Sequence, residues 1–310
     1  MIQNLKRSAS SYKGLLFAGF TAILWGFLAI ALKISLNSLN PVSIVWFRFT
    51  IAFLVLLLLM LIFDRTFIKV FHRPPLILFA ASIFLGFNYF GFISGIHQTT
   101  PANAQVFIQV GPISLALVGI VFFKEKITWK HLTGFLLLLG GLSLFYSQQF
   151  AELAGTRGNY SRGITWIVLG GISWASFSSL QKILVRTRKP NHLNIFIYGF
   201  CSLMFLPFVE FSKVPNLSLN EWLLLIFLGL NTVLAYGSLA LALKYAEANK
   251  VSVILTMNPI ITFASMAILE MVAVNWIEFE RFTPLSLAGA VLVFGGAVMV
   301  ILSGRLGKVT

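Results

Sequence analysis

The segment Phe84-Leu85-Gly86-Phe87-Asn88 occurs a second time, with one change, as Phe227-Leu228-Gly229-Leu230-Asn231. The residues on either side of it recur as well. Ala102-Asn103 returns as Ala248-Asn249, Pro112 as Pro259, Glu125 as Glu270, and Gly134, Gly140 and Gly141 as Gly289, Gly295 and Gly296. Upstream, Gly14, Trp25 and Lys33 recur as Gly163, Trp174 and Lys182 at a constant spacing of 149 residues. The sequence therefore predicts a tandem duplication, which is the first feature to establish when a fold is read from sequence.

The composition indicates the solvent in which the duplicated chain folds. Hydrophobic residues make up 58% of the 310 residues and charged residues only 10%, with a mean hydropathy of +0.90. A soluble domain of this length could not bury so much apolar surface, which predicts a polytopic membrane protein. Cys201 is the single cysteine, so no intramolecular disulfide can form.

Apolar runs of about 20 residues separated by turn residues predict ten transmembrane helices in an all-α fold. The expected spans are Gly14–Ile34, Val42–Ile62, Leu76–Ile96, Ala102–Phe122, His131–Ser147, Gly163–Lys182, Leu193–Phe211, Trp222–Leu243, Val251–Met271 and Leu285–Ser303. The polar segment 148–162 is the one connection long enough to link two halves. We therefore expect an N-terminal five-helix repeat at 1–147, a linker at 148–162 and a C-terminal five-helix repeat at 163–310. The first span is too long for the apolar region of a signal peptide, although Ala29-Ile30-Ala31 resembles a cleavage site.

The distribution of positive charge predicts the orientation. The termini and the even-numbered loops carry 17 Lys and Arg, whereas the loops on the other side carry five. By the positive-inside rule, both termini of an inner (plasma) membrane protein then face the cytoplasm. Membrane orientation and anionic lipid thus account for the net charge of +14, and we expect no nucleic-acid partner.

Five helices per copy is an odd number, so the second copy must enter the membrane inverted relative to the first. Inverted repeats around a central cavity are typical of secondary transporters, whose substrate sites lie near the bilayer midplane at the repeat interface. The sequence therefore predicts two inverted five-helix repeats that work by alternating access.

At these residues the chain resembles the drug/metabolite transporter superfamily, in its ten-helix EamA-type branch. The resemblance covers residues 14–303 and rests on Trp25-Gly26, Arg48-Phe49, Ala102, Pro112, Glu125, Gly134 and Gly140-Gly141, with Trp174, Pro259, Glu270, Gly289 and Gly295-Gly296 in the second copy. It implies an inner-membrane carrier with a central cavity that exports amino acids, other metabolites or toxic compounds without a nucleotide-hydrolysing subunit. The second copy departs from the pattern with Ala175 in place of Gly26 and with nothing like Arg48.

Polar and aromatic residues in the middle of the spans are the candidate substrate-binding residues. An amide that faces lipid is costly, so these side chains should face protein or a water-filled cavity, with plain interhelical hydrogen bonding as the alternative. Gln105 and Gln109 share one helical face, and mid-helix tryptophans suit an aromatic or apolar substrate group. The candidates are Trp25, Asn88, Tyr89, Gln105, Gln109, Ser173, Trp174, Ser176, Ser178, Asn231, Tyr236, Thr256 and Asn258.

Three further groups are candidates for hinges, gates or anchors. Pro112 and Pro259 interrupt equivalent helices and predict kinks with freed carbonyl groups. Arg48 is the cation deepest in a span, either as a functional residue or as one that snorkels outward, and Lys33 and Lys182 should snorkel at helix ends, with a gating role left open. Glu125 and Glu270, where helices meet loops, are expected to anchor helix ends.

The residues that an enzyme or a cofactor would need are missing from the pattern. The four histidines lie far apart near loops and have no metal-ligand spacing, and no Asp or Glu lies deep in a span. We therefore expect no enzyme, no metal and no cofactor, and a facilitated or poorly coupled carrier rather than a proton exchanger. The predicted function is export of small metabolites, with amino acids as the leading class. A multidrug or cationic-compound exporter is the alternative, and a channel or lipid scramblase the alternative of another class. Expected partners are the small-molecule substrate and membrane lipid, with the protein a monomer or weak homo-oligomer.

Overall fold

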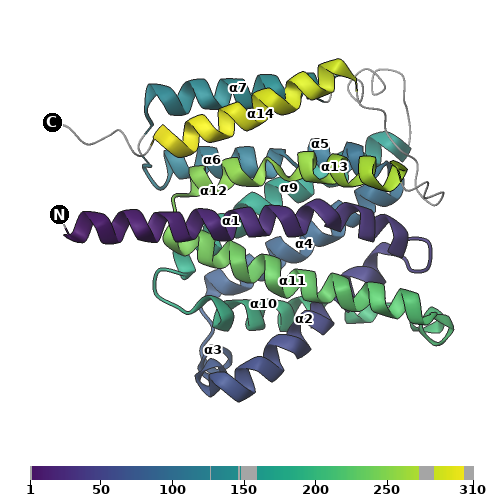
Figure 1. The fold of residues 1–310 in the computed structure, drawn as a ribbon. Coiled ribbons are helices and arrows are strands. Elements are labelled where there is room, and N and C mark those ends of the chain that lie inside the picture. Colours follow the sequence, from purple (N-terminus) through teal and green to yellow (C-terminus); the bar gives the residue numbers. More distant parts are fainter. Residues whose placement is uncertain (1, 126, 146, 148–158, 272–282, 304–310) are drawn as a thin grey trace.

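The computed structural model describes residues 2–125, 127–145, 147, 159–271 and 283–303, which form a bundle of α-helices with no β-strand among them (Figure 1). Residues 148–158 of the linker predicted at 148–162 lie outside the described residues, and the remainder, from Asn159, is the first turn of helix α9. The long helices are α1 Ile2–Ser35, α2 Pro41–Phe63, α4 Leu76–Gln98, α7 Trp129–Phe145, α9 Asn159–Leu184, α10 Pro190–Phe205, α11 Leu219–Tyr245 and α14 Pro284–Ser303.

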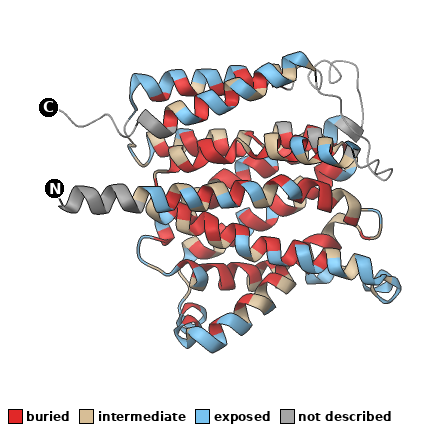
Figure 2. Ribbon diagram, viewed as in Figure 1, coloured by how far each residue is buried: buried red, intermediate tan, exposed pale blue. Residues whose placement is uncertain are grey.

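Eight helical segments of the described chain are long and apolar enough to cross a membrane. They are Ser11–Ser35, Pro41–Phe63, Leu76–Gln98, Asn103–Val121, Ser161–Leu184, Pro190–Phe208, Leu219–Tyr245 and Ala248–Leu269. Two shorter apolar helices, Trp129–Phe145 and Pro284–Val300, accompany them. Buried residues gather in the middle of the bundle, and many large apolar side chains of the outer helices are exposed (Figure 2). An apolar exterior over internally hydrogen-bonded helices is what a bilayer requires, so the chain has the fold of a multi-pass membrane protein.

Two of the predicted continuous spans are broken helices in the structure. The fourth consists of α5 Pro101–Phe107 and α6 Val110–Val121, and the ninth of α12 Ala248–Leu255 and α13 Asn258–Met271. Each turn lies just before a proline. Because Pro112 has no N–H to donate to Ile108, the Ile108 carbonyl accepts the Gly111 N–H instead, at 2.9 Å. The expected kinks are therefore full interruptions of the helix.

The seventh helix is shorter than predicted. The sequence suggested a span to Phe211, but α10 ends at Phe205 and the chain continues as the 3-10 turns η2 Leu206–Phe208 and η3 Phe211–Asn216. Pro207 accounts for this end, because it removes the donor for the preceding turn and its ring clashes with the carbonyl four residues earlier.

The helices pack in pairs that join the two halves of the chain. Helix α4 packs on α9, α1 on α11, α2 on α10, and α7 on α14, the last pair forming one edge of the bundle (Figure 1). In the α7–α14 pair, a Cβ atom on Gly134 would lie 2.9 Å from the Gly296 carbonyl oxygen, and one on Gly141 would lie 2.8 Å from that of Gly289. Only glycine permits this approach of two helix backbones.

The ends of α2 and α10 are also joined. Asp64 follows α2 directly and precedes the short helices η1 Arg65–Ile68 and α3 Lys69–His72. Its carboxylate lies 2.7 Å from the Lys189 ammonium nitrogen and 2.9 Å from His192 Nε2, at the start of α10. The hydrogen bond from Lys189 is the main reason that the pKa of Asp64 lies well below its usual value.

Candidate functional site: a central cavity

A cavity lies where helices of both halves meet, and water-sized spheres can be centred in about 60 Å³ of it. The turns that break the α5–α6 and α12–α13 helices lie beside it. The residues that line it are Trp25, Leu28, Arg48, Asn88, Tyr89, Phe92, Gln105, Ile108, Gln109, Pro112, Trp174, Tyr236, Leu255 and Asn258.

Most of the side chains singled out in the sequence meet at this cavity. Eight of the candidate substrate-binding residues line it, together with Arg48 and Pro112. The eight are Trp25, Asn88, Tyr89, Gln105, Gln109, Trp174, Tyr236 and Asn258. Residues far apart in the chain are thus brought to one place from helices α1, α2, α4, α5, α6, α9, α11 and α13 and from the turn at Gln109.

The five other candidate residues lie outside the lining of this cavity. Asn231 Nδ2 donates to the Leu24 carbonyl at 2.8 Å, and Thr256 Oγ1 donates to the Val253 carbonyl at 2.6 Å. Ser178 is fully buried among helices, Ser173 donates to the Phe84 carbonyl, and Ser176 to that of Ile172. Hydroxyl and amide groups of this kind often hydrogen-bond a nearby backbone carbonyl, so mid-span polarity alone does not place them in a cavity.

Aromatic rings form one wall of the cavity. Trp25 and Trp174, the tryptophans that occupy equivalent positions in the two copies, meet edge to face with ring centres 5.7 Å apart. The Tyr236 ring lies 5.4 Å from that of Trp25 and 5.6 Å from that of Tyr89. Such a wall offers apolar surface and ring faces to a ligand.

Amide groups face the same space. Gln105 Nε2 donates to Thr262 Oγ1 at 3.2 Å and Gln109 Nε2 donates to the Gln105 carbonyl at 3.3 Å, which orients both side chains. The side-chain amide oxygens of Gln105, Gln109 and Asn258, unlike the backbone carbonyl of Gln105, are buried and accept no hydrogen bond from the described residues. They are therefore available as acceptors for a ligand.

Arg48 lies in the cavity wall rather than reaching outward. It is 2% exposed, its Nε donates to Thr232 Oγ1 at 3.3 Å, and its guanidinium carbon lies 4.2 Å from the centre of the Tyr89 ring. The snorkelling alternative is therefore wrong for this residue. The hydrogen bond and the cation–π contact hold the guanidinium at the cavity.

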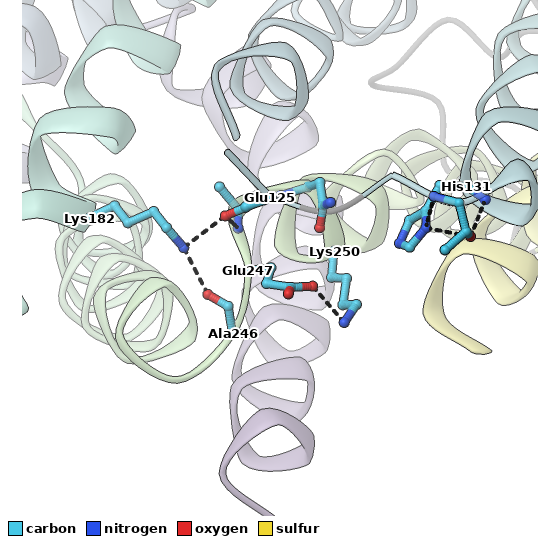
Figure 3. A network of polar contacts seen from close by, with 9 residues as sticks. Glu125, His131, Lys182, Ala246, Glu247 and Lys250 are labelled. Carbon is cyan, nitrogen blue, oxygen red and sulfur yellow. Dashed lines mark hydrogen bonds and ion pairs between the residues drawn. The ribbon is translucent and has the colours of Figure 1, made fainter. Parts of the chain in front are cut away.

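A second cluster fastens the two halves at one end of the bundle (Figure 3). The Glu125 carboxylate accepts the first N–H groups of α12, from Ala248 at 2.7 Å and Asn249 at 2.9 Å, where a negative charge stabilises a helix. Lys182 Nζ lies 3.3 Å from Glu125 Oε1 and donates to the Ala246 carbonyl at 2.9 Å. Lys182 is buried at 7% exposure, so the expectation that it snorkels into water is wrong.

The local backbone explains how Glu125 reaches α12. Lys124 adopts a left-handed conformation, with φ 51°, and the Glu125 N–H returns to the Gly119 carbonyl at 3.1 Å, which closes α6 and turns the chain. A Cβ atom at position 119 would lie 2.6 Å from Glu125 Oε2, so glycine there leaves room for the carboxylate. Nearby, Glu247 pairs with Lys250 and Thr128 contacts His131 (Figure 3).

The other predicted gate and anchor residues are placed as follows. Lys33, the counterpart of Lys182, is half-buried and reaches the Thr99 carbonyl at 3.5 Å. Pro259 is buried just after the α12–α13 turn and outside the cavity lining. The side chain of Glu270 lies outside what the structure describes.

Four apolar lining residues were not predicted: Leu28, Phe92, Ile108 and Leu255. Leucine, isoleucine and phenylalanine are common throughout these helices, so no pattern in the sequence distinguishes them from lipid-facing or core residues. Ile108 and Leu255 share one usable signal, because each lies four residues before one of the paired prolines, Pro112 and Pro259.

Known proteins match the chain along nearly its whole length. The profile of the EamA-like transporter family matches residues 12–147 and 161–302. A transporter of Haemophilus influenzae, named only as uncharacterized, is 32% identical over 94% of this chain and 96% of its own. The Escherichia coli inner membrane transporter YhbE, also named as uncharacterized, is 29% identical over 94% of this chain and 92% of its own.

A solved crystal structure shares the fold. It superposes with a TM-score of 0.72 at 19% identity, covering 97% of this chain and 99% of the other. The matches define the class of the protein, a multi-pass membrane transporter. The chain belongs to the EamA-like transporter family, as the resemblance seen in the sequence indicated.

Proposed function

We propose that the protein is a secondary transporter that exports small metabolites, with amino acids as the leading class, by alternating access between two inverted five-helix halves. The observation that carries the proposal is the cavity itself. It is lined from both halves and lies beside two helices broken at equivalent prolines. Discontinuous helices around a central site are the usual construction of secondary transporters.

The directions of α1 and α9 support the inversion. Lys33 near the end of α1 and Gly163 near the start of α9 both contact Thr99. A Cβ atom on Gly14, near the start of the apolar span Ser11–Ser35 of α1, would lie 2.7 Å from Ala246 Cβ, and Lys182 near the end of α9 donates to the Ala246 carbonyl. These equivalent helices of the two copies therefore run in opposite directions through the bundle.

The packing and the chain ends support the same reading. Exchanging the two copies converts the α4–α9 contact into the α1–α11 contact, and leaves α2–α10 and α7–α14 as pairs of equivalent helices. The start of α1 and the end of α14 lie at the same end of the bundle (Figure 1). An even number of crossings with both termini in the cytoplasm, at the inner membrane, accounts for these features and for the charge asymmetry of the loops.

The cavity lining favours amino acids over cationic drugs and nucleotide sugars as substrates. A buried guanidinium in the wall disfavours a cationic drug as the ligand. Among the described residues Arg48 is the one cation in the lining, which is too few for the phosphates of a nucleotide sugar.

Flux measurements on reconstituted vesicles separate a carrier from a channel or scramblase. With a neutral amino acid such as L-phenylalanine inside and its radiolabelled form outside, a carrier predicts saturable uptake that rises when the inside is loaded. Flux that stays linear with concentration and is indifferent to loading would favour a channel and contradict the proposal.

Overproduction in cells tests the direction and the site. Cells should survive toxic amino-acid analogues better when they overproduce the protein, and Gln109→Ala or Trp174→Ala should remove that protection while the protein remains in the membrane. Trp166→Ala, on the same helix but outside the cavity, is the matched control. If no compound in the panel gives protection although the protein is folded, export loses its support. If Trp174→Ala and Trp166→Ala behave alike, Trp174 has a packing role.

A further inference from the structure

We propose that Arg48 binds the carboxylate of the transported molecule and thereby determines the charge selectivity of the cavity. This inference rests on the proposed function, because it assigns a ligand chemistry to the same cavity. The observation behind it is a buried cation in the cavity wall that forms no ion pair with any described residue.

The acidic side chains described in the structure are all held elsewhere. Glu125 binds Lys182 and the start of α12, and Asp64 binds Lys189 and His192. Glu210 pairs with Lys213, Glu247 with Lys250, and Glu221 with Ser38 and Ser218. None of these five carboxylates lines the cavity, so no described residue supplies a counter-charge to Arg48.

The environment of Arg48 leaves the guanidinium suited to an anion. Its Nε is engaged with Thr232 Oγ1 and its face lies over the Tyr89 ring, so two of its contacts are neutral. Burial of an ion without an opposite charge costs several kcal/mol, and a carboxylate that enters the cavity would offset that cost with a two-point hydrogen-bonded pair. A single guanidinium matches a monovalent carboxylate better than a phosphate dianion.

The rest of the lining defines the other end of the ligand. The buried side-chain amide oxygens of Gln105, Gln109 and Asn258 accept no hydrogen bond from the described residues, and they are suited to the N–H groups of an ammonium. The rings of Trp25 and Trp174 provide the apolar wall. The cavity is therefore complementary to a zwitterion with an apolar or aromatic body, and its negative end pairs with Arg48.

The sequence of the second copy supports a recognition role rather than a scaffold role. The position 149 residues after Arg48 is Ile197, which is fully buried in α10. The equivalent helix of the second copy thus packs with an aliphatic side chain at that position, so the fold does not require a cation there. The charge belongs to one half only.

The test compares four probes that share a phenyl ring and differ in charge: L-phenylalanine, phenethylamine without the carboxylate, 3-phenylpropionate without the ammonium, and phenylphosphonate. Binding to the purified full-length protein in lipid nanodiscs is followed by tryptophan fluorescence and by calorimetry. We expect L-phenylalanine to bind most tightly and 3-phenylpropionate to bind detectably. Phenethylamine should bind at least about 30-fold more weakly than L-phenylalanine, the scale of losing one partner of a buried charge pair.

Three variants assign the selectivity to the residue. Arg48→Gln should weaken L-phenylalanine by a similar factor and leave phenethylamine unchanged or tighter, while Arg48→Lys, which keeps the charge but loses the two-point geometry, should give an intermediate loss. Gln105→Leu should weaken L-phenylalanine and spare 3-phenylpropionate. Melting temperatures in the same nanodiscs verify folding, and Arg48→Lys keeps the test decisive if Arg48→Gln does not fold.

The outcomes separate this inference from the proposed function. Equal selectivity in wild type and in folded Arg48 variants would overturn the role of Arg48, as would preference for phenethylamine or phenylphosphonate. Saturable, trans-stimulated flux of a cation such as tetraphenylphosphonium would also overturn the role of Arg48, but the protein would still be a transporter. Failure of every solute to show saturable flux would remove the proposed function itself.

Discussion

The two copies of the repeat share their architecture but contribute unequally to the cavity. Each copy supplies a central tryptophan, a helix broken before a proline and a glycine-rich fifth helix. Yet ten of the 14 lining residues come from the first copy and four from the second. Arg48 and Gln105 with Gln109 lie in the first copy, whereas the second contributes Asn258 as its one amide. The shared features would serve the movement, and the unshared ones the recognition of the substrate.

The two copies also differ at the ends of their first helices, α1 and α9. Lys182 is buried and bound to Glu125, whereas its counterpart Lys33 is half-buried with one long contact to the Thr99 carbonyl. The Glu125 cluster therefore ties the two halves together more firmly than the single contact of Lys33 does. Substitutions at matched positions of the two copies test each of these differences.

The largest effect should come from the glycine contact between α7 and α14, the equivalent fifth helices of the two copies. A Cβ atom at Gly289 would lie 2.4 Å from the Phe145 backbone nitrogen, so Gly289→Val should separate α7 from α14 and remove most folded protein. Gly295→Val is the matched control, because no atom lies within 4 Å of a Cβ there. Size-exclusion profiles in detergent measure the folded yield. Similar yields for both variants would show that the close approach is not required.

The next effect concerns the two matched lysines. Lys182→Gln breaks a buried ion pair and should destabilise the protein by about 3–5 kcal/mol, whereas Lys33→Gln should cost less than about 1 kcal/mol. The double variant Lys182→Gln with Glu125→Gln should lose less than the sum of the single losses. Thermal denaturation in nanodiscs provides the comparison. Equal losses of stability for the Lys33 and Lys182 variants would contradict the stronger tie between the halves at Lys182.

The smallest effect distinguishes the two prolines. Pro112 lines the cavity and Pro259 does not, so Pro112→Ala should change both the maximal rate and KM, and Pro259→Ala mainly the rate, each by a few-fold. Initial rates of L-phenylalanine flux across a concentration series measure both constants. An unchanged rate in both variants would remove the hinge role and leave the prolines as packing residues.

Much of the fold and of the cavity could be predicted because both depend on periodic or repeated features of the sequence. Long apolar runs predict membrane helices, and duplication identified Trp25 with Trp174 and Pro112 with Pro259. The amides at 105 and 109 were found because an amide in a membrane needs a partner. These signals depend on the residue itself and on its spacing along the chain.

The rest depended on how each helix is rotated and on its neighbours. Asn231 and Thr256 have the same mid-span polarity as Asn258, but they bond to backbone carbonyls away from the cavity. Arg48 was placed by depth alone, which could not reveal the Tyr89 ring beneath it. The Glu125–Lys182 pair joins residues 57 positions apart and required the turn at Lys124.

Access to the cavity from both sides of the membrane is the most direct test of the account. Leu28→Cys places a thiol in the cavity lining of a chain whose one natural cysteine, the buried Cys201, has been replaced by alanine. Membrane-impermeant maleimides applied from each side of oriented vesicles report its reactivity. Two inverted halves that alternate predict labelling from either side, slowed from both by L-phenylalanine. A thiol that reacts from one side only, with and without the amino acid, would contradict it.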